Sequence, residues 1–170
     1  IDRECINTRA ASDGLFFYPP MAKLAENGEN RYRRAAFVGL DVSHDRFDLA
    51  LAVMEGAAFQ IKWMTEAFSG GIPDGALKLT GGAAKSALWS QMIADVIGKP
   101  VIIPEVADMA CVGAAMIAGI GSGVFADAAE ACRRMTTGGK TVTPDPEKAE
   151  MYASAYERYK HNAALVGGMK

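Results

Sequence analysis

The residues best suited to chemistry lie in one short stretch, LKLTGGAAKSALWSQM at residues 77–92. An apolar strand pattern runs into Gly81-Gly82, and a helical pattern begins near Ser86. Glycines at such a corner permit a positive φ and let a ligand approach the backbone with no side chain in the way. The helix start offers free N–H groups, and Ser86 adds a hydroxyl. The corner could hold a base, a ribose or a phosphate edge, or it could be a tight turn without a ligand; these residues alone leave both open.

Two other glycine clusters imitate nucleotide-binding motifs. Residues 119–123 (GIGSG) follow a helical pattern, and Val124 stands where a dinucleotide fingerprint needs its third glycine. Residues 138–141 (GGKT) end like a phosphate loop, but Arg134 occupies its first glycine position and no strand precedes it. We therefore expect a helix C-terminus at the first cluster and a surface turn at the second.

The remaining titratable side chains form no obvious catalytic set. His44 and His161 are the only histidines, and each is expected at an exposed helix end without partners spaced for metal binding or acid–base work. Glu55 lies mid-helix, where a buried and paired carboxylate is an alternative, but a solvated or capped glutamate is the expectation. Asp41 and Asp45 suit the start of a helix.

The cysteines, the net charge and the apolar runs argue against several classes of protein. The three cysteines, Cys5, Cys111 and Cys132, lie far apart without a CxxC pair, which favours buried, reduced thiols in a cytoplasmic protein over disulfides or zinc. The net charge of −2 gives no field that would gather nucleic acid or an anionic membrane. The longest apolar run, residues 110–120, is too short to span a bilayer.

The elements that must position the Gly-Gly corner alternate in type. Apolar residues every three or four positions predict helices over 43–68, 86–97 and 109–120, the first capped by Ser43 and the second ended by Gly98. Residues 76–80 and 100–104 have the pattern of short buried strands. This alternation predicts parallel strands and an α/β fold. Because two strands make a poor sheet alone, we expect further strands upstream.

The flanking segments are predicted from local signals. Residues 14–20 form an apolar run closed by two prolines, which predicts a short strand or an extended segment, and the polar residues 23–36 are expected to form an exposed loop. Asp127 with Glu130 resembles a capping box, and Asp145 before Pro146 predicts the start of a last helix. Everything after residue 120 is expected to be helix or turn. The tyrosines of the last helix, Tyr152, Tyr156 and Tyr159, are expected to pack onto the domain.

Three blocks in this order resemble the FGGY family of carbohydrate kinases. Residues 79–117 resemble the family's hallmark block, with a Gly-Gly turn, a helix containing Trp and an Ala-Asp pair, a strand ending in Pro-Glu and a Gly-Ala-Ala helix. Residues 35–59 resemble its preceding helix, and residues 143–159 resemble its Pro-rich start and Tyr-rich C-terminal helix. One departure is that residues 23–27 show no counterpart of the family's Gly-Glu-Arg-x-Pro stretch.

The resemblance implies an actin-like, ribonuclease-H-like ATPase fold, with residues 1–170 as the C-terminal portion of the second domain of a two-domain, cytoplasmic sugar kinase. It implies ATP and Mg²⁺ as cofactors and a xylulokinase-like pentulose, sugar or polyol substrate. By the same resemblance Gly81, Gly82, Ala83 and Ser86 contact the nucleotide. The phosphate loop, magnesium ligands and catalytic base belong to an absent N-terminal part, which becomes the partner of this chain; a homodimer stays open. The competing class is a non-kinase actin-like ATPase or a binding-only module.

Overall fold

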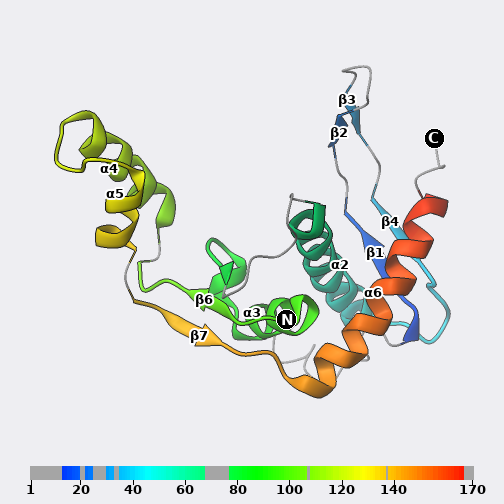
Figure 1. Cartoon of the computed structure of the whole chain (residues 1–170). Coiled ribbons are helices and arrows are strands. Elements are labelled where there is room, and N and C mark those ends of the chain that lie inside the picture. The colour runs from blue at the N-terminus through cyan, green and yellow to red at the C-terminus, as the bar shows by residue number, and fades with distance from the viewer. Residues whose placement is uncertain are drawn as a thin grey trace.

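The computed structural model (Figure 1) describes residues 13–19, 22–24, 30–32, 35–67, 77–106, 108–136 and 138–166. The elements in chain order are β1 (Phe16–Tyr18), β2 (Ala22–Leu24), β3 (Asn30–Tyr32), β4 (Ala36–Val38), α2 (Arg46–Ala67), β5 (Leu77–Lys78), the 3₁₀ turn η2 (Ala83–Lys85), α3 (Ala87–Ile97), β6 (Val101–Ile103), α4 (Met109–Gly121), α5 (Ala128–Met135), β7 (Lys140–Val142) and α6 (Pro146–Val166).

A parallel strand pair carries the candidate corner. In it β5 pairs with β6, with Leu77 opposite Val101, and the crossover between them contains α3. The predicted parallel strands within 76–80 and 100–104 and the predicted helices are therefore confirmed, although residues 68 and 76 lie outside the described residues. The strand β7 adds to the other edge of β6 in antiparallel direction. The expectation of a surface turn over 138–141 is wrong at Lys140 and Thr141, which pair with β6.

Two hairpin ladders precede α2. Strand β1 confirms the predicted strand within 14–20, and it pairs antiparallel with β4. The predicted loop over 23–36 is wrong in part, because β2 and β3 form an antiparallel ladder there. The polar composition of β2 and β3, which project from the rest of the domain in Figure 1, hid these strands, because alternating apolar residues are the sequence signal of a strand.

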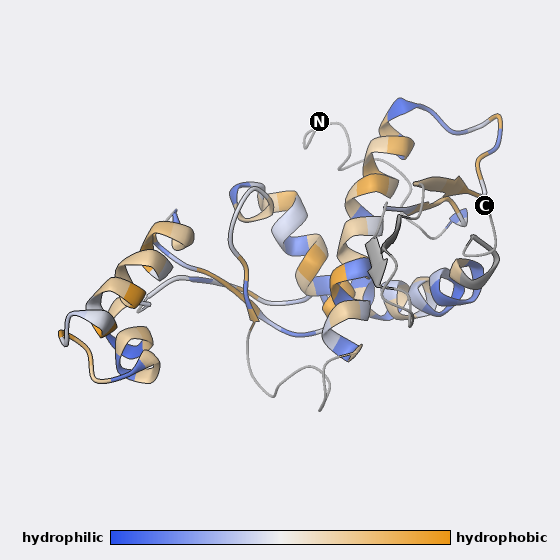
Figure 2. Ribbon diagram, turned by 90° about the horizontal axis from the view of Figure 1, so that it is seen from above, coloured by the Kyte–Doolittle hydropathy of each residue, from blue (hydrophilic) through white to orange (hydrophobic). Residues whose placement is uncertain are grey.

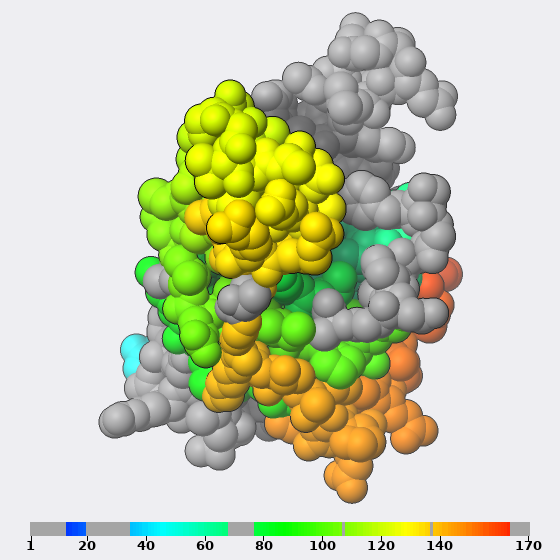
Figure 3. Space-filling view, turned by 60° about the vertical axis from the view of Figure 1, so that its left-hand side comes forward, coloured from blue at the N-terminus to red at the C-terminus, as the bar shows by residue number. Residues whose placement is uncertain are grey.

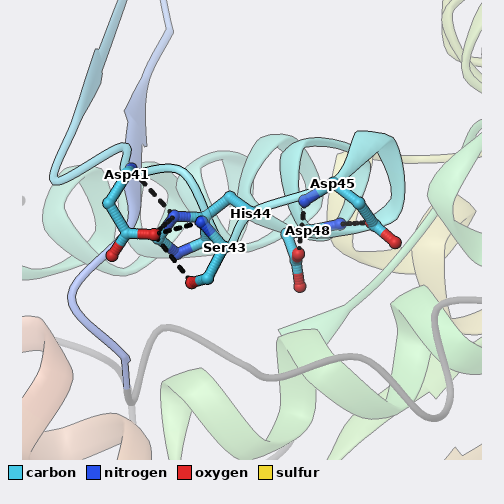
Figure 4. A network of polar contacts seen from close by, with 5 residues as sticks. All are labelled: Asp41, Ser43, His44, Asp45 and Asp48. Carbon is cyan, nitrogen blue, oxygen red and sulfur yellow. Dashed lines mark hydrogen bonds and ion pairs between the residues drawn. The ribbon is translucent and has the colours of Figure 1, made fainter.

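The start of α2 is capped by Asp45 (Figure 4). Its carboxylate accepts hydrogen bonds from the backbone N–H groups of Phe47 at 2.6 Å and Asp48 at 3.1 Å, while its own N–H donates to the Asp48 carboxylate at 2.7 Å. The prediction that Ser43 is the cap is therefore wrong. Ser43 instead donates its N–H and its hydroxyl to Asp41 Oδ1, each at 2.7 Å.

His44 lies inside the same loop. Its Nδ1 accepts a hydrogen bond from the Asp41 N–H at 3.0 Å, and its side chain is only 7% exposed. The expectation of an exposed His44 is therefore wrong, whereas His161 on α6 is exposed as expected. The same Nδ1 lies 3.2 Å from Asp41 Oδ1, so the ring belongs to the polar network of this loop.

The apolar core lies between β1, α2, α3 and α6. Phe59 of α2 packs against three tyrosine rings of α6, with centroid distances of 5.0–6.0 Å, and Tyr18 stacks on Tyr159 at 4.4 Å. All three tyrosines of α6 are buried, which confirms their predicted packing. Asp145 caps α6 by accepting from the N–H groups of Glu147 and Lys148, as predicted.

Glu55 is buried within this core. It is 2% exposed and accepts a hydrogen bond from the Tyr152 hydroxyl at 3.0 Å. The expectation of a solvated glutamate is therefore wrong, and the alternative of a buried, paired carboxylate is correct. A buried polar group needs such partners, because an unsatisfied one destabilises the fold by roughly 1–3 kcal/mol.

The helices α4 and α5 form a lobe at one end of the molecule (Figures 1 and 3). The predicted cap of α5 is present, since Asp127 accepts from the Glu130 N–H at 2.7 Å. Figure 2 shows that α4 is apolar along its length, yet none of its residues is buried. Cys111 and Cys132 are free and exposed on this lobe, so the expectation of buried thiols is wrong for both, and Cys5 lies outside the described residues. Among the described helices, none has the length and apolarity needed to cross a bilayer.

Candidate functional site

A cleft of about 170 Å³ opens where the parallel strands β5 and β6 end. One wall is the segment between β5 and α3, and the other is the segment that leaves β6; the lining residues are Leu79, Thr80, Gly81, Ala84, Lys85, Ile103, Pro104, Glu105 and Val106. Ligands of α/β proteins bind at the carboxyl ends of parallel strands, because the loops there diverge and helix N-termini converge. The position of this cleft is typical of a small-molecule site.

Gly81 makes the turn out of β5. Its φ is +81°, in the left-handed region that glycine adopts without strain. Gly82 follows with φ −62° and ψ −41°, a right-handed conformation open to any residue. Open space surrounds the position that a Cβ would take on either residue. The turn therefore requires glycine at 81 for its backbone, whereas at 82 the absence of a side chain leaves the backbone open to a ligand.

Ser86 is used to start α3. Its hydroxyl oxygen accepts a hydrogen bond from the Trp89 N–H at 3.1 Å. The buried Ser90 hydroxyl lies 2.7 Å from the Ser86 carbonyl oxygen and 3.1 Å from that of Ala83, which ties η2 to the first turn of α3. Trp89 in turn donates its indole N–H to the Met54 carbonyl oxygen of α2 at 3.2 Å. The turn is thus fixed to the core through α3 before any ligand binds.

The structure separates the four predicted nucleotide contacts. Gly81 lines the cleft, whereas Gly82 is exposed beside it at the start of η2. Ala83 packs partly against the core, and Ser86 serves as a helix cap. The nucleotide contacts of all four residues stay a prediction.

The charged cleft residues Lys85 and Glu105 were missed as site residues. Glu105 was predictable in principle, because it follows Pro104 at the end of the predicted strand at 100–104. The Pro-Glu pair was interpreted only as part of the family block. Near them Asp108 caps α4 by accepting from the N–H groups of Ala110 and Cys111, both at 3.1 Å. Hydrogen bonds from Cys111, then that from Ala110 and the positive charge of Lys85, hold the pKa of the Asp108 carboxyl below its ordinary value. Asp108 therefore stays ionised as the cap of α4.

Metal-binding groups are not assembled in the part of the chain that the structure describes. No three His, Cys, Asp or Glu side chains gather there in a way that could hold an ion. The cleft itself contributes one carboxylate, that of Glu105. The described residues therefore do not fit a magnesium site of their own.

Comparison with known proteins identifies relatives along nearly the whole chain. L-xylulose/3-keto-L-gulonate kinase of Escherichia coli (strain K12) is 33% identical over 162 residues, which are 93% of this chain and 31% of that protein. Autoinducer-2 kinase of Escherichia coli O139:H28 is 35% identical over 129 residues, 73% of this chain and 24% of that protein. The chain thus spans about a third or less of the length of these relatives.

Solved structures agree with the sequence relatives. A xyloylose kinase from Brucella ovis superposes with a TM-score of 0.78 at 28% identity, covering 99% of this chain and 35% of that one. A xylulose kinase from Rhodospirillum rubrum gives 0.72 at 29% identity, covering 96% and 33%. The family described as "FGGY family of carbohydrate kinases, C-terminal domain" matches residues 4–122. The chain therefore belongs to the FGGY carbohydrate kinases and has the α/β, actin-like fold of their C-terminal domain.

Proposed function

We propose that this chain supplies the adenosine side of the nucleotide site in an ATP-dependent carbohydrate kinase. The observation that carries the proposal is the cleft at the carboxyl ends of β5 and β6, in a chain of this family. Gly81 lines the cleft in a left-handed conformation, and α3 begins after the η2 turn that follows it. Backbone N–H groups at a helix start favour anionic or polar ligand groups. This half of the site binds and orients ATP.

The reaction is phosphoryl transfer to an alcohol. The acceptor hydroxyl oxygen forms a bond to the γ-phosphorus of ATP, the bond between that phosphorus and the β–γ bridging oxygen breaks, and ADP leaves. The acceptor proton passes to a base outside these residues. Mg²⁺ neutralises phosphate charge in such transfers, and its ligands belong to the N-terminal part of the kinase. The residues described here contribute by positioning, which can lower a barrier substantially without covalent chemistry.

The N-terminal part of the kinase is the proposed partner of this chain. The outward face of α4 carries no charge; its exposed residues are Ala110, Cys111, Ala114, Ala115, Ile117, Ala118 and Gly121. A helix that is apolar all round is normally buried. The relatives are about three times as long as this chain, so the remainder of the polypeptide is available to cover the face.

The full-length kinase that contains this chain tests the proposal. Production of ADP is measured with Mg²⁺ and a panel of acceptors taken from the relatives: xylulose, 3-keto-L-gulonate, autoinducer-2, glycerol and gluconate. We expect turnover that depends on both Mg²⁺ and an acceptor, with a pentulose or related sugar preferred. ADP release at an equal rate without any acceptor would identify an ATPase instead.

A Gly82→Val variant of the full-length enzyme tests the position of the nucleotide. Because Gly82 has a right-handed conformation, valine fits the backbone there without the strain that it would meet at Gly81. Its branched side chain would stand in the path of the purine or ribose. We expect the KM for ATP to rise by about ten-fold or more, with a much smaller change in the sugar KM and in Tm. An unaltered ATP KM in a well-folded variant would mean that the nucleotide does not lie against this turn.

A further inference from the structure

Two charged side chains stand on different walls of the cleft. Lys85 ends the η2 turn on the β5 side, and Glu105 follows Pro104 on the β6 side. Among the described residues that line the cleft, these are the only two with charged side chains. A ligand that spans the cleft therefore meets a cation on one side and an anion on the other.

The carboxylate of Glu105 packs closely against Gly138. A Cβ on Gly138 would lie 3.1 Å from the carboxylate carbon of Glu105 and 3.2 and 3.3 Å from its oxygens. The next residue, Gly139, brings β7 so close to β6 that its Cβ would lie 2.7 Å from the Ile103 carbonyl oxygen. Gly138 and Gly139 are thus not part of a phosphate loop. Their lack of side chains lets the chain that enters β7 approach the end of β6 closely, next to Glu105.

The Glu105 carboxylate is available to a ligand. Among the described residues, none donates a hydrogen bond to it, and the side chain is exposed. A carboxylate accepts hydrogen bonds and repels phosphate, so the end of ATP that suits it is the nucleoside, which carries ribose hydroxyls and an exocyclic amine. The positive charge of Lys85 suits the phosphates instead. The two charges therefore favour one orientation of a bound nucleotide, with its nucleoside near Glu105 and its phosphates near Lys85.

We propose that Glu105, which packs against Gly138, is a specificity-determining residue for the nucleotide. Its carboxylate accepts a hydrogen bond from the nucleoside part. The inference rests on the proposed kinase function and assigns to the glycine pair a positioning role. A hydrogen bond to a charged group is stronger than a neutral one, and its loss weakens binding by about ten-fold or more.

Binding and kinetics of the full-length kinase test Glu105 directly. We expect Glu105→Ala to raise the Kd and the KM for ATP about ten-fold, with the sugar KM and kcat changed less than about two-fold. The matched control Glu150→Ala removes an exposed carboxylate from α6 and should leave the ATP Kd unchanged. An ATP Kd for Glu105→Ala equal to that of the wild type, in an enzyme that turns over, overturns the inference. Absence of any ATP-dependent turnover in the wild type contradicts the kinase function instead.

Nucleotide analogues identify the donor. We compare ATP with 2′-deoxyATP, 3′-deoxyATP and ITP, which lacks the exocyclic amine. One analogue should bind the wild type about ten-fold more weakly than ATP, and that difference should disappear in Glu105→Ala. A loss at the 2′ or 3′ position assigns the hydroxyl, and a loss with ITP assigns the amine. If Glu105→Ala weakens ATP and all three analogues equally, no donor is recognised and the inference fails.

A double-mutant cycle tests the contact between Gly138 and Glu105. Gly138→Asn adds a Cβ 3.1 Å from the Glu105 carboxylate carbon, close enough to displace it, while asparagine tolerates the positive φ of +80° better than most residues. The variant should show part of the Glu105→Ala loss in ATP binding and no further loss when combined with Glu105→Ala. Losses that add in the double variant would show that Gly138 does not act through Glu105. The Tm of each variant separates this effect from destabilisation.

Discussion

The isolated 170-residue chain is expected to transfer no phosphate to any pentulose, polyol or hexose, whereas the full-length protein is expected to do so. Within the described residues no acidic group assembles that could hold Mg²⁺. Among the described residues that line the cleft, Glu105 is the single carboxylate and Lys85 the single cation. Phosphoryl transfer needs the metal, the acceptor and the base aligned with the γ-phosphate, and removing that alignment removes most of the rate.

A coupled assay for ADP with ATP, Mg²⁺ and the sugar panel measures this difference. The isolated chain must first show a cooperative thermal transition, so that a missing activity is not a missing fold. Binding of ATP without turnover is compatible with the proposal, because the adenosine side of the site is present. Sugar-dependent turnover by the isolated chain would contradict it, since the base and the metal ligands would then have to lie within these residues.

Features with a strong period or a local hydrogen-bond signature were predictable from the sequence. The apolar spacing in α2, α3 and α4 gave their positions to within a few residues. The caps Asp127, Asp145 and Gly98 were predictable because a short polar or flexible residue beside a periodic run has a specific backbone role. The parallel pairing of β5 and β6 followed from the crossover helix.

Features that depend on tertiary contact were not predictable. The strands β2 (AKL), β3 (NRY) and β7 (KTV) carry charged or polar side chains, so no apolar run marks them as Val-Ile-Ile marks β6. Asp45 rather than Ser43 caps α2, because the Ser43 hydroxyl donates its hydrogen bond to Asp41. Glu55 is buried because Tyr152, 97 positions away, donates a hydrogen bond to it. The charged cleft residue Glu105 is brought beside Gly138 only by the pairing of β6 with β7.

Alkaline pH is expected to unfold this chain steeply, because four buried tyrosines resist ionisation. Burial raises the pKa of Tyr18, Tyr152, Tyr156 and Tyr159, and the Glu55 charge raises that of Tyr152 further. In the unfolded chain each phenol titrates near its ordinary pKa of about 10. The stabilisation is therefore complete below that value and is lost as the pH rises above it, because only the unfolded state releases these protons.

The size of the effect follows from the number of protons. Each proton released only on unfolding lowers the free energy of unfolding by about 1.4 kcal/mol per pH unit, so four give about 5 kcal/mol per unit. Lys62 acts in the opposite direction, because burial lowers its pKa and the folded state releases that proton first. In the range from about pH 10, where the unfolded tyrosines begin to ionise, to the ordinary lysine pKa of about 10.5, the net slope is therefore about 4 kcal/mol per unit. A domain of ordinary stability would unfold within about two units above pH 10.

Two tyrosine variants separate ionisation from packing. The Tyr159 hydroxyl is buried and, within the described residues, has no hydrogen-bond partner, so Tyr159→Phe should leave stability at neutral pH nearly unchanged and reduce the alkaline slope by one proton. Tyr152→Phe should reduce the slope equally but destabilise the fold at neutral pH by about 1–3 kcal/mol, since Glu55 loses a donor. Urea unfolding at a series of pH values gives both quantities. An alkaline slope in Tyr159→Phe that equals the wild-type slope would mean that this phenol ionises in the folded chain as readily as in the unfolded one.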